Sequence, residues 1–269
     1  MERIGGWLAG EEAGWLVGGM LNFVGFLLTW WTGTHKLTDI CGCGAFTVMA
    51  LQRLLHLSQR PRPPPSNTQL LLIACVVLWS IRLGGFLFLR ILRSPEDKRL
   101  ASFFPKPGEI PIKLAGFWFI QALWSLITML PILTACRVNP AKRPTEGSKL
   151  WFLPFLVGFL IEVFADHQKS TFKAMPENKN KFCDQGLWYY SRHPNYFGEI
   201  VVWWSLYMAS LPLAPKWTIV SPLFITFLLL RVSGIPILEA SYDKKYGEDV
   251  SYQQYKSSTS LLVPMPKFT

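Results

Sequence analysis

Long uncharged apolar stretches alternate along the chain with shorter segments that hold most of its charged residues. An apolar run of about 20 residues is long enough to cross a bilayer as a helix. The pattern therefore predicts an all-α membrane protein, a polytopic bundle of about seven transmembrane helices. The expected spans are residues 13–34, 40–57, 69–91, 114–136, 150–165, 200–215 and 217–238, of which the second, interrupted by Arg53, is the weakest.

The composition narrows the class further. Half of the 269 residues are apolar, 14% are aromatic and only 16% are charged, with a formal net charge of +10. A soluble domain usually carries about a quarter charged residues, and a disordered or nucleic-acid-binding tail is rich in charge and poor in aromatics. The five cysteines are scattered and form neither a disulfide framework nor paired zinc-ligand spacings. We therefore expect a multi-pass membrane protein with no nucleic-acid partner and no metal site.

Lysine and arginine counts predict the orientation. The side with the first, third and fifth loops and the C-terminal tail carries sixteen of these residues, against nine on the other side. The positive-inside rule then places the C-terminus and the two long loops on the cytosolic side of the membrane. If the protein is eukaryotic, we expect that membrane to be the endoplasmic reticulum. The N-terminus lacks a basic segment, so the first apolar run is expected to be a retained span. With no internal repeat, residues 1–269 are expected to form one domain.

Two arginines lie on one face of the third span. Arg82 stands near its middle, where a charged side chain costs about 2.5–3.5 kcal/mol. Arg93 follows eleven residues later, only about 20° away around the helix. The pair could line a polar cavity for an anionic or carbonyl-bearing ligand. Equally, Arg82 could pair with Glu162 to hold the bundle together, and Arg93 could be a positive-inside anchor.

The fifth span contains a similar polar stripe. Its members are spaced by four, three and four residues, which places them on one side of a helix: Glu162, Asp166, Lys169 and Lys173. A surface helix could show this spacing for Lys169 and Lys173. It does not explain Glu162, which has apolar neighbours on both sides.

Residues 186–199 hold the densest group of polar and aromatic residues. Pro194 suits the first turn of a helix, with Ser191 or His193 as its cap. Arg192 beside the positive end of that helix favours a phosphate or another anion. Asn195 and Glu199, four residues apart, present an amide and a carboxylate suited to a carboxamide, a ribose or an adenine edge. A helix cap with a snorkelling arginine explains Arg192 and Pro194 only.

The string Ser191-Arg-His-Pro-Asn-Tyr-Phe-Gly-Glu199, with Gly186 and Trp188 before it and Trp203-Trp204 after it, resembles the membrane proteins related to steroid 5-alpha-reductases. It is most similar to their "domain of unknown function" branch. The resemblance covers residues 38–266 approximately. It implies a seven-helix fold with NADPH at the cytosolic mouth, and reduction of an activated C=C bond in a lipid or sterol-like substrate.

The resemblance also assigns residues. By position it implies that Asp166, Asn195, Glu199, Arg93, Tyr252 and Lys256 contact the cofactor, and the local pattern adds Lys169, Arg192, His193 and Tyr196. Alignment on Arg82 places Trp79 where the steroid reductases have a substrate-binding tyrosine, and the second span offers no glutamate. We therefore expect Arg82, assisted by Trp79, to stabilise charge on a substrate carbonyl, at roughly 3–4 kcal/mol per good donor.

Two alternatives remain open. The Arg-His-Pro-x-Tyr-x-Gly core is shared with membrane methyltransferases that use S-adenosylmethionine to methylate a lipid or a prenylated thiol. In that case Glu162 and Glu199 would face the sulfonium. The second alternative is a non-catalytic lipid-binding membrane protein that has kept the fold.

Overall fold

The computed structural model describes residues 13–59, 64–92, 103–104, 109–139 and 146–267. Within these ranges every regular element is a helix, and the β-type pairing is an isolated bridge between Ser191 and Ser260. The chain forms two compact units. The first contains residues 1–148 and 209–221, and the second contains residues 149–208 and 222–269. Single-domain organisation remains a prediction.

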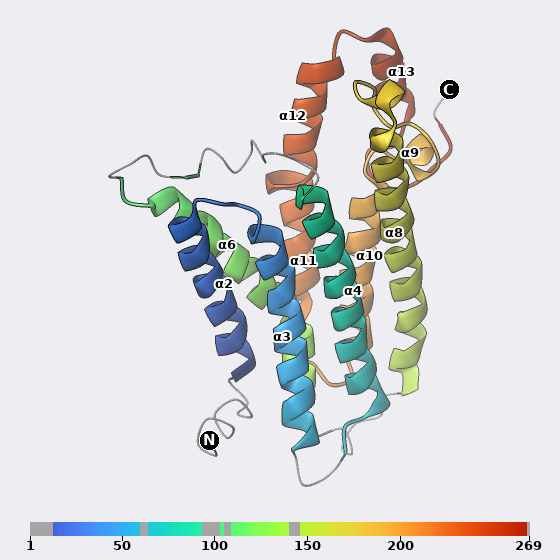
Figure 1. The fold of residues 1–269 in the computed structure, drawn as a ribbon. Coiled ribbons are helices and arrows are strands. Elements are labelled where there is room, and N and C mark those ends of the chain that lie inside the picture. The colour runs from blue at the N-terminus through green and yellow to red at the C-terminus, as the bar shows by residue number, and fades with distance from the viewer. Residues whose placement is uncertain (1–12, 60–63, 93–102, 105–108, 140–145, 268–269) are drawn as a thin grey trace. The chain divides into compact units, whose positions relative to one another are not determined.

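The first unit is built on four long helices. They are α2 (Ala13–Thr32), α3 (Thr38–Ser58), α4 (Asn67–Leu92) and α6 (Ile112–Thr128), followed by the short helices α7 (Leu130–Ala135) and η4 (Lys216–Ile219). Helix α3 packs against both α2 and α4, which lie on either side of it in Figure 1. At the centre, the ring of Phe46 meets Trp79 and Trp124 edge-on, with centroids 5.1 and 4.8 Å away.

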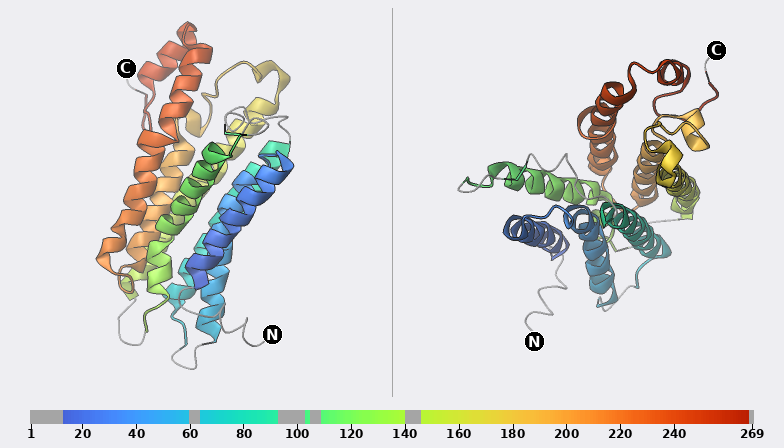
Figure 2. Two further views of the ribbon diagram at one scale, coloured as in Figure 1. Left: turned by 90° about the vertical axis from the view of Figure 1, so that its left-hand side faces the viewer. Right: turned by 45° about the horizontal axis from the view of Figure 1, so that its top comes forward.

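The second unit begins at Lys149, within η2 (Glu146–Trp151), and continues into α8 (Phe152–Ala174). The remaining elements are η3 (Pro176–Asn178), α9 (Leu187–Tyr190), α10 (Pro194–Ser210), α11 (Val220–Phe227), the π-helical turn η5 (Leu228–Val232), α12 (Ile235–Tyr246) and α13 (Val250–Ser258). Helices α8 and α10 run side by side (Figure 2). They approach closely at Gly158 and Gly198, where a Cβ atom on Gly158 would lie 2.8 Å from the carbonyl oxygen of Gly198.

Each expected span overlaps a helix or consecutive helices, and the sixth ends earlier than expected because α10 stops at Ser210. Five described helical segments are long and apolar enough to cross a membrane: residues 13–32, 38–58, 67–92, 149–174 and 216–246. The fourth expected span divides at Met129 into α6 and α7 because Pro131 begins a new helical segment. The fifth and seventh continue beyond their expected ends, to Ala174 and Tyr246. The chain is an all-helical membrane protein; seven crossings and a cytosolic C-terminus remain predictions.

Candidate functional site

The close approach of α8 and α10 brings buried polar side chains together. Because Gly198 has no side chain, α10 lies directly against the backbone of Glu162: a Cβ atom on Gly198 would be 2.9 Å from its amide nitrogen. Glu162, Asp166 and Glu199 are all buried. One turn from the crossing, the Nδ2 of Asn195 donates to the Oδ1 of Asp166 at 3.1 Å. The two acids of the α8 stripe and Glu199 of α10 therefore lie in the interior of the second unit, whereas Lys169, Lys173 and Asn195 are partly exposed.

The start of α10 fixes the residues that precede it. Pro194 is the first helical residue, and the carbonyl of His193 accepts a hydrogen bond from the N–H of Phe197 at 3.1 Å. The hydroxyl of Ser191 in turn accepts from the N–H of His193 at 3.1 Å. The imidazole of His193 stacks on Tyr196, with ring centroids 5.7 Å apart. The carbonyl of His193 thus accepts the first of these hydrogen bonds, and the Ser191 hydroxyl binds the N–H that precedes the helix. Capping of α10 by either side chain remains a prediction.

Glu239 on α12 joins three cationic or titratable side chains. Its carboxylate accepts hydrogen bonds from Arg192 and from the Nε2 of His193, the latter at 2.8 Å, and the Nζ of Lys256 on α13 lies 3.9 Å away. We call these four residues the Glu239 cluster. Sequence reasoning assigned Arg192, His193 and Lys256 to the site but omitted Glu239. A signal was present, since Glu239 is the first acidic residue after the last apolar stretch.

The protonation state of His193 follows from its surroundings. Burial lowers the pKa of His193 below its ordinary value of 6.5, although hydrogen bonding to Glu239 acts in the opposite direction. The imidazole is therefore neutral near pH 7. Because the carboxylate of Glu239 only accepts, Nε2 carries the proton and Nδ1 offers an acceptor lone pair. This Nδ1 is buried and has no hydrogen-bond partner among the residues that the structure describes.

Two further buried atoms also have no hydrogen-bond partner within the described residues. Asn195 donates through Nδ2 to a carboxylate, which fixes its amide orientation and leaves Oδ1 as an acceptor. Within the described ranges, neither Oδ1 of Asn195 nor Nε of Arg192 has a hydrogen-bond partner. A buried polar group without a partner costs about 1–3 kcal/mol, so native sites usually satisfy such atoms with a ligand or water. The site thus offers two acceptors and one cationic donor.

A second layer holds the Glu239 cluster in place. Asp243, one turn along α12, accepts from Lys256 at 2.5 Å and from the hydroxyl of Tyr252 at 3.1 Å. Burial, aided by the hydrogen bond to Asp243, raises the pKa of Tyr252 above its ordinary value of 10, so its hydroxyl remains a donor. The structure therefore places Tyr252 beside the cluster, and Asp243 links Tyr252 to Lys256, a member of the cluster.

The two lysines of the α8 stripe point into aromatic surroundings. The ammonium of Lys169 lies 4.0 Å from the ring centroid of Trp188 and 5.3 Å from that of Tyr242. Trp188 is itself fixed, because its indole N–H donates to the carbonyl of Ala165 at 2.8 Å. Lys173 donates to the hydroxyl of Tyr246 at 3.2 Å. These lysines are partly sheltered cations rather than members of a solvated helix face.

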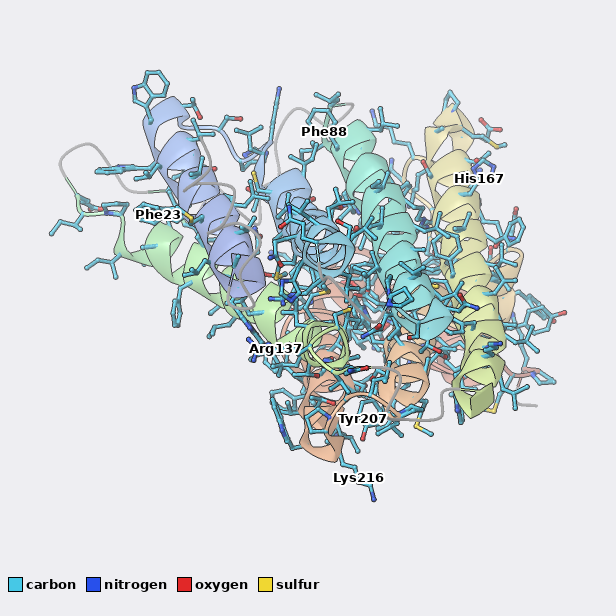
Figure 3. The ribbon with its side chains drawn as sticks, turned by 90° about the horizontal axis from the view of Figure 1, so that it is seen from below. Phe23, Phe88, Arg137, His167, Tyr207 and Lys216 are labelled. Carbon is cyan, nitrogen blue, oxygen red and sulfur yellow. The ribbon has the colours of Figure 1, made fainter. Side chains whose placement is uncertain are left out.

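The opposite side of α8 differs. His167, adjacent in sequence to Asp166, is exposed on the outer side of the helix (Figure 3). It therefore takes no part in the cluster and provides a natural control position.

The residues expected to act on the substrate belong to the first unit. Trp79 is fully buried in α4 against Phe46. Arg82, one turn later, is half-buried with its guanidinium 5.7 Å from the ring centroid of Phe86. Glu162, its alternative partner, belongs to the second unit. Arg93 lies outside the described residues. Roles for Trp79, Arg82 and Arg93 remain predictions.

Comparison with known proteins agrees with the sequence pattern. A family model described as "Protein of unknown function (DUF1295)" matches residues 25–259. The chain is also 29% identical over 118 residues to 3-oxo-5-alpha-steroid 4-dehydrogenase 1 from Rattus norvegicus. That match covers 44% of this chain and 40% of the relative, so the chain spans less than half of the relative's length. No solved structure matches the chain.

Proposed function

We propose, because this chain belongs to the DUF1295 family and resembles a steroid dehydrogenase over part of its length, that it is a membrane oxidoreductase. It uses NADPH to reduce an activated C=C bond in a lipid or sterol-like substrate. The observation that carries the proposal is the polar site of the second unit, where two acceptors and a cationic donor are buried without partners among the described residues.

The residues present fit NADPH. The Nδ1 of His193 and the Oδ1 of Asn195 can accept from N–H or O–H groups such as those of a carboxamide or a ribose. Arg192, Lys256 and Lys169 supply positive charge for phosphate groups. Asp166 holds the amide of Asn195 in the accepting orientation, and the ring of Tyr196 supports His193. When bound, NADPH supplies the hydride.

The chain's remaining tasks are to polarise the substrate and to exclude water. Arg82 is the proposed donor to the carbonyl oxygen on which negative charge develops, at roughly 3–4 kcal/mol for a well-placed donor. Trp79 assists as a hydrogen-bond donor, since an indole N–H does not ionise near neutral pH. Glu199 and Glu162 are buried at the α8–α10 crossing and are assigned to the polar site of the second unit. Spanning helices keep the substrate in lipid, in the endoplasmic reticulum if the source is eukaryotic.

The test is thermal stability of the detergent-purified protein with NADPH, NADH or S-adenosylmethionine at equal excess. A ligand at 100 times its Kd adds about 2.7 kcal/mol to the free energy of unfolding. We expect a shift with NADPH that Asn195→Leu abolishes and that the exposed control His167→Asn retains. A shift with S-adenosylmethionine alone would replace the proposal with a methyltransferase. No shift with any of the three would favour a non-catalytic lipid-binding protein.

A further inference from the structure

An exposed apolar patch lies on the second unit, outside its long helices. It consists of two tyrosines on α9 and three residues of the C-terminal segment, each between 39% and 45% exposed: Tyr189, Tyr190, Leu261, Val263 and Met265. The three residues of the C-terminal segment alternate along the chain. Their exposure alternates as well, because Leu262 and Pro264 between them are only partly exposed. We call these five residues the interfacial patch.

Backbone hydrogen bonds make the patch continuous. The N–H of Met265 donates to the carbonyl of Tyr190 at 3.1 Å, which holds the C-terminal segment against α9. The ammonium of Lys267 lies 4.2 Å from the ring centroid of Tyr189. The patch therefore combines aliphatic side chains, two phenol rings and a positive charge on a surface that the second unit itself leaves exposed.

The exposed side chains of α8 indicate the depth of the patch relative to the bilayer. The exposed side chains of this helix are apolar through its first part, at Leu153, Leu156, Val157, Leu160 and Phe164. From His167 onward the exposed positions are mainly polar, including Ser170 and Thr171. A lipid-facing helix changes in this way where it leaves the hydrocarbon core. The core boundary on the second unit therefore lies between Phe164 and His167.

Helix α9 is attached at the same level. The indole N–H of Trp188 donates to the carbonyl of Ala165, and the N–H of Leu187 donates to the side chain of Gln168 at 2.9 Å. Both acceptors flank the boundary on α8. Tyr189 and Tyr190 follow directly, so the interfacial patch lies level with the edge of the hydrocarbon core.

We propose that the interfacial patch inserts into the headgroup–acyl boundary of the bilayer that the chain spans. Tyrosine prefers this zone because its ring is apolar and its hydroxyl is polar. The aliphatic side chains enter the outer acyl region, and Lys267 meets anionic headgroups. The patch is thus a further membrane contact of the second unit, added to those of its apolar helices.

This contact has a consequence for the polar site. The C-terminal segment holds the residues before α10: the hydroxyl of Ser191 donates to the carbonyl of Leu262 at 2.7 Å, and the N–H of Arg192 donates to the carbonyl of Ser260 at 2.9 Å. Because one face of the segment contacts lipid while its backbone binds these residues, insertion sets the Glu239 cluster at the depth of the lipid headgroups. The inference does not depend on which cofactor the cluster binds.

Spin labels test the insertion in nanodiscs of phosphatidylcholine and phosphatidylglycerol at 3:1. A nitroxide is attached to Val263→Cys, to Leu156→Cys on the lipid-facing side of α8, or to Glu248→Cys at the turn between α12 and α13. The labelled parent protein provides the background from its five free cysteines. Collision rates with oxygen, which concentrates in lipid, and with a water-soluble nickel chelate report depth.

We expect the Val263 label to collide more often with oxygen than with nickel, as at Leu156, and the Glu248 label to show the reverse. A Val263 label that behaves like the Glu248 label would overturn the proposal. So would a Val263 label shielded from both reagents, because another protein surface would then cover the patch. Leu261→Cys repeats the measurement on the same face, so that a folding defect at one position does not decide the result.

Discussion

Replacing Glu239 with glutamine tests whether the Glu239 cluster holds the second unit together. The side chain of Glu239 is 16% exposed, and those of its partners Arg192 and His193 are 13% and 1% exposed. Glutamine keeps one acceptor oxygen, so one of the two close hydrogen bonds survives. The other is lost, and the positive charge of Arg192 loses its compensation.

The magnitude follows from these contacts. A hydrogen bond to a charged group contributes about 1.5–3 kcal/mol, and breaking a fully buried pair costs about 3–5 kcal/mol. Partial exposure and the surviving bond reduce the second figure, so we expect Glu239→Gln to lower the free energy of unfolding by about 2–3 kcal/mol. At about 2–4 °C per kcal/mol for a chain of this size, Tm falls by about 4–12 °C.

The assay is a thermal scan of detergent-purified variants at pH 7.5. Glu177→Gln is the matched control, because Glu177 is exposed in η3 and the substitution removes the same charge. We expect the control to stay within about 0.5 kcal/mol of the parent. If both variants shift Tm by the same small amount, the cluster does not stabilise the fold and the reasoning fails.

Three further predictions concern the same unit. Because the folded-state pKa of His193 lies below 6.5, the contribution of the neutral imidazole to stability is complete above pH 6.5 and is lost as the pH falls through the folded-state pKa. The decrease in Tm from pH 7.5 to pH 5 should therefore be smaller in His193→Gln than in the parent protein. An equal decrease in the two proteins would contradict this. Gly198→Ala should lower the free energy of unfolding by about 1–3 kcal/mol, because the added Cβ forces α10 away from α8. Gly116→Ala on α6, which has open space at its Cβ, should leave the free energy of unfolding unchanged or raise it by up to about 1 kcal/mol in the same thermal scan. Equal effects of the two substitutions would contradict the close approach of α8 and α10. Tyr255→Phe removes the 2.7 Å hydrogen bond to the carbonyl of Trp188 and should cost about 1 kcal/mol by thermal scan, which an unchanged Tm would refute.

Local patterns predicted the helices well. Apolar runs with at most two charged residues predicted the five described segments that are long and apolar enough to cross a membrane, because a bilayer demands about 20 apolar residues regardless of the neighbours. The four-three-four spacing from Glu162 to Lys173 correctly indicated one continuous helix, since α8 runs to Ala174. The string at residues 191–199 identified the family, and the match over residues 25–259 confirms that recognition.

Long-range pairings were not predictable in the same way. Glu239 is 46 residues from His193 in sequence, and no local period connects them. The C-terminal segment that holds Ser191 and Arg192 shows no helical pattern, so only the folded backbone reveals its role. The division at Met129 depends on a single proline within an otherwise uniform apolar run, which composition does not distinguish from a continuous helix.

The most direct test of the central claim is equilibrium binding of NADPH to the purified protein and to Asn195→Leu, with His167→Asn as the control. The Oδ1 of Asn195 is a buried acceptor two residues along the chain from His193 of the Glu239 cluster, whereas His167 is exposed on α8. The account predicts saturable binding to the parent and the control, and at least tenfold weaker binding to Asn195→Leu. Equal NADPH affinity in all three proteins, or saturable binding of S-adenosylmethionine alone, would contradict it.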